Sequence, residues 1–166
     1  LYNHMEDTHI IFDPGIHTFY KYIHTYGDKE RIDGIILSHV HIDHANDLNI
    51  LIELMTNGGR EKRGEVVVPK QAIENKILQP YLKEFPEKID IIQPNARYKI
   101  KNLEIVASIP HDHGVETYGF IIKSSKNKIG IVTDTKYFPE LLQVYKNCGI
   151  LIMNVAYYIN NKEKAK

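Results

Sequence analysis

Three histidines and an aspartate lie within six residues of one another, at His39, His41, Asp43 and His44. Their imidazole and carboxylate groups are nitrogen and oxygen ligands that suit a borderline divalent ion such as zinc, manganese or iron. The cluster directly follows the apolar run 35–37. Because open α/β proteins build their sites at the carboxyl ends of strands, this stretch predicts half of a metal site.

The spacing within the cluster indicates two directions of ligand approach. In an extended segment alternate side chains share a face, so His39 and His41 point the same way, whereas Asp43 and His44 follow after the chain begins to turn. This favours two adjacent metal ions. The alternative is a solvated histidine-rich loop, or a helix start with Asp43 or Asn46 as its N-cap. Dense His/Asp clusters are uncommon without metal, so we favour the metal site.

Further ligand types follow predicted strands elsewhere in the chain. His111 and His113 lie in a turn between two strands, and Asp134 comes at the end of the apolar strand 128–133. Metal sites gather ligands from loops that are distant in the sequence. This turn could therefore supply the ligands that the cluster at residues 39–44 does not. Asp134, and Asp13 in the turn after strand 8–12, could instead be simple turn formers.

Apolar runs and turn residues predict alternating strands and helices. We expect strands at residues 8–12, 34–37, 66–68, 89–92, 98–100, 103–108, 117–123, 128–133 and 150–153. Helices are expected at residues 19–26, 48–55, 69–78 and 139–146, the third with Pro69 as its first residue. Antiparallel runs of strands together with strand–helix alternation predict a layered α/β (α+β) architecture in one domain, residues 1–166.

The composition limits the class of protein. The 166 residues include 21 basic and 21 acidic side chains, and this balance argues against a strongly basic nucleic-acid-binding domain. The single cysteine, Cys148, excludes an intramolecular disulfide framework and fits a reducing compartment. No apolar run approaches the ~20 residues of a membrane span, and no signal peptide is evident. We therefore expect a cytoplasmic protein without membrane contact.

The run from Ser38 to His44 resembles the signature of the metallo-β-lactamase superfamily, whose members are mostly binuclear metal hydrolases with a four-layered αββα fold. The turn 110–114, followed by Thr117-Tyr118-Gly119-Phe120, is similar to the next ligand-bearing turn of the family. That register implies that His113 is the ligand and that His111 supports it or lines the pocket, although the two could exchange roles.

The resemblance also implies a cofactor of two divalent metal ions, with zinc expected first and manganese or iron as alternatives. The implied ligands are His39, His41 and His113 for one ion, and Asp43, His44 and Asp134 for the other. Asp134 resembles the bridging carboxylate that touches both ions, and Asp43 would orient the nucleophile or pass a proton. Asp13, in an Asp-x-Gly turn, would support the ligands from outside.

Two features of the family are missing from the sequence. There is almost no room before Asp13 for the usual N-terminal strand, and no histidine follows His113, where the family has a last metal ligand. The chain opens on Leu1 and closes on the polar run 160–166. We therefore expect a fold that is incomplete at both ends, in part of a longer protein.

Short motifs favour the phosphodiesterase and ribonuclease Z branch, because the Gly-His-Thr context of the glyoxalase and β-lactamase branches is absent. No ribonuclease Z exosite arm is recognisable, so the expected substrate is a small cyclic or oligonucleotide phosphodiester, attacked by a metal-bridging hydroxide. The alternatives are a carbonyl hydrolase acting on a lactone, thioester or β-lactam, and a non-catalytic metal-binding module. The sequence indicates no protein partner and leaves the oligomeric state open.

Overall fold

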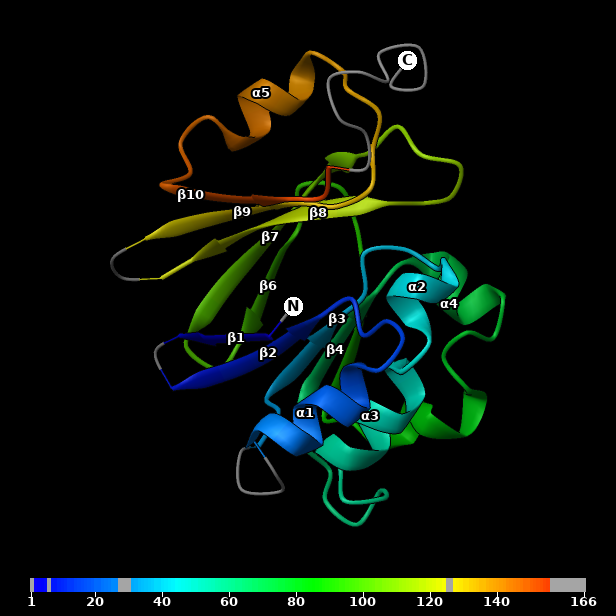
Figure 1. Ribbon diagram of the computed structural model, residues 1–166. Helices are drawn as coiled ribbons and strands as arrows, with labels where there is room; N and C mark the ends of the chain where they lie inside the picture. Colours follow the sequence, from blue (N-terminus) through cyan, green and yellow to red (C-terminus); the bar gives the residue numbers. More distant parts are fainter. Residues whose placement is uncertain (1, 6, 27–30, 125–126, 156–166) are drawn as a thin grey trace.

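Two β-sheets pack face to face, with helices on both outer surfaces (Figure 1). The computed structural model describes residues 2–5, 7–26, 31–124 and 127–155. From top to bottom in Figure 1 the layers are α5, the second sheet (β6 to β10), the first sheet (β1 to β5), and helices α1 and α3. This confirms the αββα architecture expected from the sequence.

The first sheet has the strand order β1-β2-β3-β4-β5. Its strands are β1 Tyr2–Met5, β2 Thr8–Phe12, β3 Gly34–Ile36, β4 Glu65–Val68 and β5 Lys88–Ile91. β1 is antiparallel to β2, and the remaining neighbours are parallel. The crossovers contain α1 Thr18–Tyr26, α2 Ile42–Ala45, α3 Leu48–Met55, α4 Lys70–Glu74 and the 3-10 helix η1 Pro80–Glu84. The carboxyl ends of β2 and β3 therefore meet at one edge.

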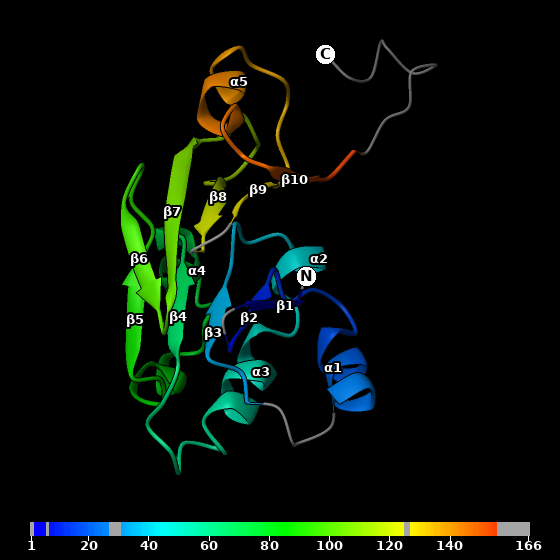
Figure 2. The same cartoon turned by 90° about the vertical axis from the view of Figure 1, so that its left-hand side faces the viewer.

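The second sheet has the order β10-β9-β8-β7-β6, and β5 and β6 lie at the same side of the sandwich (Figure 2). Its strands are β6 Arg97–Ile100, β7 Leu103–Pro110, β8 Tyr118–Lys123, β9 Lys128–Val132 and β10 Ile150–Met153. The strands from β6 to β9 are antiparallel, whereas β10 is parallel to β9 after a crossover through α5 Glu140–Tyr145.

Strand alternation divides the apolar residues between two cores. Ile10 and Phe12 of β2 face the second sheet, where the Phe12 ring lies 5.9 Å from that of Phe120. Ile11, between them, packs with the helices that cover the first sheet. The same division separates Val67 from Val66 and Val68 in β4. Burial on both faces explains the short continuous apolar runs of the central strands β2, β3 and β4.

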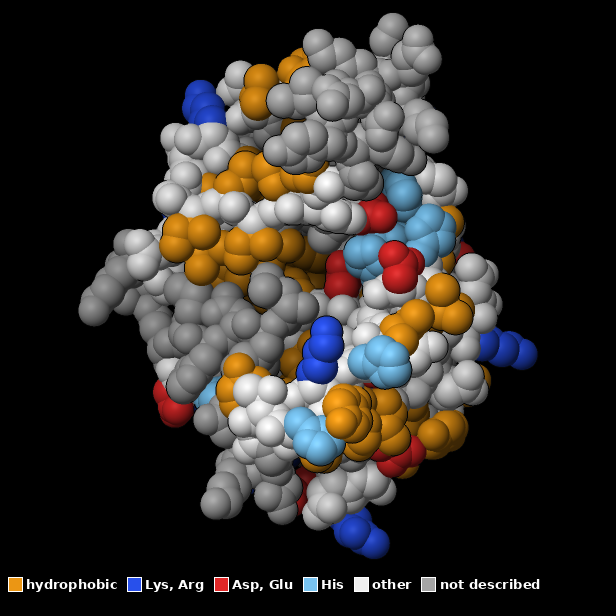
Figure 3. Space-filling view, viewed as in Figure 1, with side chains coloured by type: hydrophobic (Ala, Val, Ile, Leu, Met, Phe, Trp, Pro, Cys, Tyr) orange, Lys and Arg blue, Asp and Glu red, His pale blue; other side chains and the backbone are white. Residues whose placement is uncertain are grey.

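The outer surface of the second sheet is covered less completely. In α5 only Tyr145 is buried, whereas all four residues of β10 are 37–53% exposed. Exposed hydrophobic side chains are visible over this part of the molecule in Figure 3. β10 pairs with β9 on one side and has no second neighbour among the described strands. It is an apolar edge strand.

The structure differs from the predictions at the amino end and in the third predicted helix, and it adds the short helices α2 and η1. β1 is a strand ahead of β2, where the resemblance led us to expect none. The third predicted helix ends at Glu74, well before Leu78, because Lys76 adopts a left-handed φ of 55°. Pro69 is the N-cap of that helix, in an extended conformation, and is not its first residue. Among the described residues, every helix is too short or too polar to cross a lipid bilayer.

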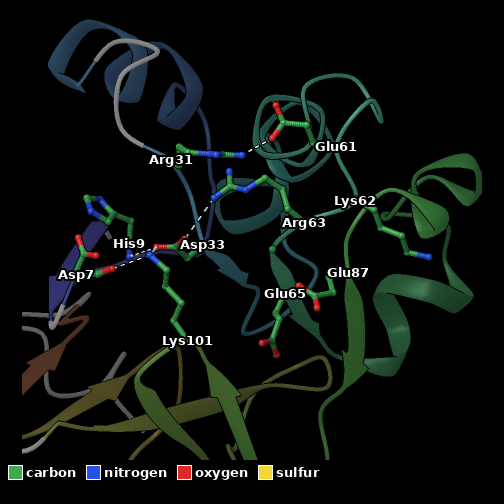
Figure 4. Close-up of a pocket in the computed structure, with 11 residues that line it drawn as sticks. Asp7, His9, Arg31, Asp33, Glu61, Lys62, Arg63, Glu65, Glu87 and Lys101 are labelled. Carbon is green, nitrogen blue, oxygen red and sulfur yellow. Dashed lines mark hydrogen bonds and ion pairs between the residues drawn. The ribbon is translucent and has the colours of Figure 1, made fainter.

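A cavity of about 830 Å³ lies at the amino ends of the parallel strands, and its charged walls pair with each other (Figure 4). Asp33, which is 8% exposed, accepts a hydrogen bond from the backbone N–H of His9 at 2.9 Å. Its oxygens also lie 3.3 Å from Arg63 Nη2 and 3.2 Å from Lys101 Nζ. Because Lys101 belongs to the β6–β7 turn, this network joins the two sheets.

Candidate metal centre

Four loops bring the predicted ligands together at one edge of the sandwich. Asp13 follows β2, and residues 39–44 follow β3. His113 lies between β7 and β8, and Asp134 follows β9. Histidine and acidic side chains accordingly gather on the right of the molecule, level with the junction of the sheets (Figure 3). Both sheets therefore contribute to the cluster.

His39, His41 and His113 form one group, whose candidate ligand atoms all lie within 4.8 Å of one another. His41 Nδ1 and His113 Nε2 are 3.1 Å apart. Two nitrogens bound at 2.0–2.1 Å to one tetrahedral zinc ion are separated by about 3.3 Å. The geometry of this pair therefore fits a shared metal ion.

The hydrogen bonds of His39 leave one of its nitrogens available. Ser38 Oγ donates to Asp13 Oδ2 at 2.8 Å, so it accepts from His39 Nδ1, also at 2.8 Å. His39 Nε2 is buried and has no hydrogen-bond partner among the described residues. Burial and the nearby His44 lower the pKa of His39 to about 4. His39 thus presents a neutral, unsatisfied nitrogen to the cluster, which is what a metal ligand requires.

Asp13 holds the ligand loop from behind. Its Oδ1 accepts the Ser38 N–H at 2.7 Å, and its Oδ2 accepts Ser38 Oγ and His44 Nδ1. Although Asp13 lies within ligand distance of His39 and His44, these bonds occupy both oxygens, and we assign it a supporting role. Gly15 packs on the same loop so closely that a Cβ atom there would lie 1.7 Å from Asp43 O. This explains the Asp-x-Gly turn.

A second group consists of Asp13, His39 and His44, whose candidate ligand atoms also lie within 4.8 Å of one another. Asp43 and Asp134 lie beside His44. With Nδ1 bonded to Asp13, His44 turns Nε2 toward Asp43 Oδ2 at 3.5 Å and Asp134 Oδ1 at 3.6 Å. Burial alone would lower the pKa of His44, but the hydrogen bond and charge of Asp13 raise it above the usual value. The Asp43 side chain is 68% exposed and lies at the mouth of the site. Both carboxylates therefore offer oxygens close to His44 Nε2.

Asp134 lies near one histidine of each group. Its Oδ2 is 4.0 Å from His113 Nε2, while its Oδ1 faces His44. Burial would raise the pKa of Asp134, but the hydrogen bond from Asn154 Nδ2 at 2.8 Å and the nearby His44 lower it. The carboxylate is therefore ionised at neutral pH and is oriented by a residue beyond β10.

His111 lies outside both groups. It is 6% exposed, and its ring nitrogens lie 3.2 Å from Tyr145 Oη and 3.3 Å from Thr133 Oγ1. Tyr145 Oη sits directly over Gly119, where a Cβ would approach it to 2.0 Å. His111 thus anchors the turn that carries His113, consistent with the supporting role expected for it.

Neither Asp43 nor Asn46 is the N-cap of a helix, as the alternative interpretation of the residue 39–44 cluster required. The N-caps of α2 and α3 are His41 and Asp47, and neither makes a side-chain capping hydrogen bond. Sequence reasoning missed Ser38 and Asn154, which hold His39 and Asp134. Their positions at the ends of β3 and β10 were the available signal, because residues just beyond strand ends border such sites.

Removal of the Asp13 carboxylate charge tests this support. We expect Asp13→Asn to weaken metal binding by about 10- to 100-fold, because Asn can neither accept equally from Ser38 and His44 nor fix their orientation. Competition with a chelating indicator would measure the affinity. The control is Asp112→Asn, because Asp112 is an exposed carboxylate next to His113 in the sequence. Equal affinities in all three proteins would contradict the role of Asp13.

The burial of His111 predicts a pH-dependent stability. Burial lowers the pKa of His111 to about 4, so below its ordinary value of 6.5 only the unfolded chain takes up a proton there. The metal-free protein should lose up to about 1.4 kcal/mol per pH unit from this group as pH falls from 6.5 to 5. Urea unfolding should show a smaller loss in His111→Gln. The same slope in both proteins would refute this.

The family model described as "Beta-lactamase superfamily domain" matches residues 8–164, and the chain belongs to this family. A protein from Methanocaldococcus jannaschii, described as uncharacterized, is 24% identical over 139 residues, which cover 81% of this chain and 52% of that protein. The ribonuclease Z of the same organism is 33% identical over 123 residues, covering 70% of this chain and 38% of the enzyme.

The solved structure of the metallo-beta-lactamase fold protein YhfI from Bacillus subtilis matches with a TM-score of 0.82 and 21% identity. The match covers 96% of this chain and 64% of that one. It supports the fold alone. The chain spans about half the length of the first relative and a smaller part of the ribonuclease Z.

Proposed function

We propose that the protein is a metal-dependent phosphodiesterase acting on a small cyclic or oligonucleotide phosphodiester. The observation that carries this proposal is the position of Asp134 near one histidine of each of two groups of ligand atoms, one containing His41 and His113 and the other containing His44. Two groups that share a carboxylate fit a pair of divalent ions, with zinc first and manganese or iron as alternatives.

Each residue of the candidate site has a separate function in this proposal. His39, His41 and His113 would hold one ion, and Asp43, His44 and Asp134 the other. Bound divalent ions supply Lewis acidity toward phosphoryl oxygens and lower the pKa of a coordinated water toward ~7. Asp43, whose side chain is 68% exposed, would orient the attacking water and accept its proton. Asp13 and Ser38 keep the imidazoles in the required tautomers.

The phosphodiester class is supported by two observations. The relative with 33% identity is a ribonuclease Z, whose name states hydrolysis of RNA. The turn with His113 continues into Thr117-Tyr118-Gly119-Phe120, and no Gly-His-Thr occurs in the chain. Neither observation excludes a carbonyl substrate, so the experiment compares the two classes directly.

The test is hydrolysis of bis(p-nitrophenyl) phosphate and of a chromogenic lactone by the protein loaded with zinc or manganese. Metal-dependent cleavage of the phosphodiester, with little on the lactone, is the expected result. Preferential cleavage of the lactone would replace the proposal with a carbonyl hydrolase. Absence of bound metal in elemental analysis would favour a non-catalytic module and overturn the proposal.

A further inference from the structure

A hollow of about 270 Å³, which we name the side pocket, borders the loop that carries the candidate ligands. One wall contains Val40 and Ile42, which flank His41 in the sequence. The opposite wall contains Lys76, Ile77 and Gln79, from the connection between α4 and η1. Ile42 is 69% exposed, so the part of the ligand loop between the candidate metal centre and the side pocket is open to solvent.

The wall formed by the connection between α4 and η1 is held by paired hydrogen bonds. Asn49 Nδ2 donates to Ile77 O at 2.8 Å, and Asn49 Oδ1 accepts from Gln79 N at 2.9 Å. At the other end of the wall, Gln71 N donates to Glu116 Oε2, and Glu116 N donates to Gln71 Oε1. Glu116 lies in the loop that carries His113. These bonds therefore fix the position of α4, next to this wall, relative to the candidate metal centre.

The lining of the side pocket has a definite chemistry. Val40, Ile42 and Ile77 supply apolar surface, and Lys76 is the only charged residue in the lining. No carboxylate in the described part of the chain pairs with the Lys76 ammonium. Lys76 also holds a left-handed φ of 55°, where a glycine or asparagine would be less strained. The pocket therefore presents an unneutralised cation beside an apolar slot.

The amide side chains add acceptors to this slot. Asn46 and Gln79 use their amide N–H groups within the protein, on Asp47 Oδ1 and Lys76 O. Their carbonyl oxygens have no partner among the described residues and can accept from an exocyclic amino group. An apolar slot with such acceptors fits a nucleobase such as adenine, and the adjacent ammonium fits a phosphate.

We propose that the side pocket binds one nucleoside and the adjoining phosphate of an oligonucleotide, whose scissile phosphodiester lies at the candidate metal centre. This inference rests on the proposed function and narrows its substrate to a nucleotide chain with at least two phosphates. The size of the pocket agrees, because about 270 Å³ lies just below the ~300–1,000 Å³ of sites that hold a whole drug-sized ligand. It suits one part of a larger substrate.

The test compares two substrates of the metal-loaded protein, the 5′-phosphorylated dinucleotide pApA and bis(p-nitrophenyl) phosphate. We expect Lys76→Ala to reduce kcat/KM for pApA by about tenfold more than for the small phosphodiester, because only pApA has the second phosphate. Lys76→Arg should restore most of the loss. The control is Lys83→Ala, in η1 and outside the pocket lining, which should change the ratio of the two values by less than about twofold.

The proposal would be overturned if Lys76→Ala lowered kcat/KM equally for both substrates. It would also be overturned if Lys83→Ala changed the ratio of the two values as much as Lys76→Ala does. Failure of the proposed function is distinguishable, because the unmodified protein would then hydrolyse neither substrate. In that case fluorescence anisotropy with labelled pApA decides the inference. Weaker binding to Lys76→Ala than to the unmodified protein supports it, and identical binding refutes it.

Discussion

Asp134→Asn should reduce metal-dependent hydrolysis by at least about 100-fold while the protein remains folded. The amide keeps the shape of the side chain but loses the negative charge that faces His44 with one oxygen and His113 with the other. A neutral group cannot hold two cations close together. Turnover of bis(p-nitrophenyl) phosphate and the metal content per chain would both be measured.

Asp112→Asn is the matched control, because Asp112 is an exposed carboxylate one residue before His113. It should retain full activity, and both variants should give the circular dichroism spectrum of the unmodified protein. Full activity in Asp134→Asn would remove Asp134 from the site. Loss of activity in both variants would show that any change of charge in this region is sufficient.

Asp33→Ala should lower the free energy of unfolding by roughly 3 kcal/mol, the largest stability effect that we expect from a single substitution. Asp33 is buried and bonds to His9 N, while Arg63 and Lys101 lie within ion-pair distance. Removing the carboxylate leaves the partly buried Arg63 guanidinium without its ion-pair partner and removes one contact of Lys101 with the first sheet, while its hydrogen bond to Asp7 O remains. Urea unfolding at neutral pH measures the change.

Glu87→Gln, in the wall of the same cavity, is the control for Asp33→Ala. Glu87 is exposed, so its substitution should alter stability by less than about 0.5 kcal/mol. Equal effects of the two substitutions would contradict the assignment of the network to Asp33. Because the cavity lies at the amino ends of the strands, we expect metal binding to be unchanged in both variants.

Much of the fold follows from local patterns in the sequence. Apolar runs such as 35–37 and 66–68 indicate buried parallel strands, and the structure places their alternate residues in two different cores. The end of α4 near Lys76 could not be predicted from local patterns. The apolar residues beyond it continue a helical pattern, but Asn49 bonds the backbone at Ile77 and Gln79 and draws the chain away from the helix.

The candidate ligands could be identified because their types and spacing are unusual. The contacts that orient them could not, because they join residues far apart in the sequence. Ser38 contacts Asp13 across 25 positions, and Asn154 contacts Asp134 across 20. Serine and asparagine are common in loops for many reasons, so no local pattern distinguishes these two. The side pocket likewise depends on the packing of α4 and η1 against the ligand loop.

The exposure of β10 has a practical consequence for work with this 166-residue polypeptide. Among the described residues β10 has no second neighbouring strand, and its sequence Ile-Leu-Ile-Met contains no charge or proline, so this edge can pair with another strand, including its own counterpart in a second molecule. We therefore expect concentrated preparations to self-associate through β10. Ile152→Lys would place a charge on this edge and should lower the light scattering of concentrated samples, whereas unchanged scattering would show that β10 is not the contact.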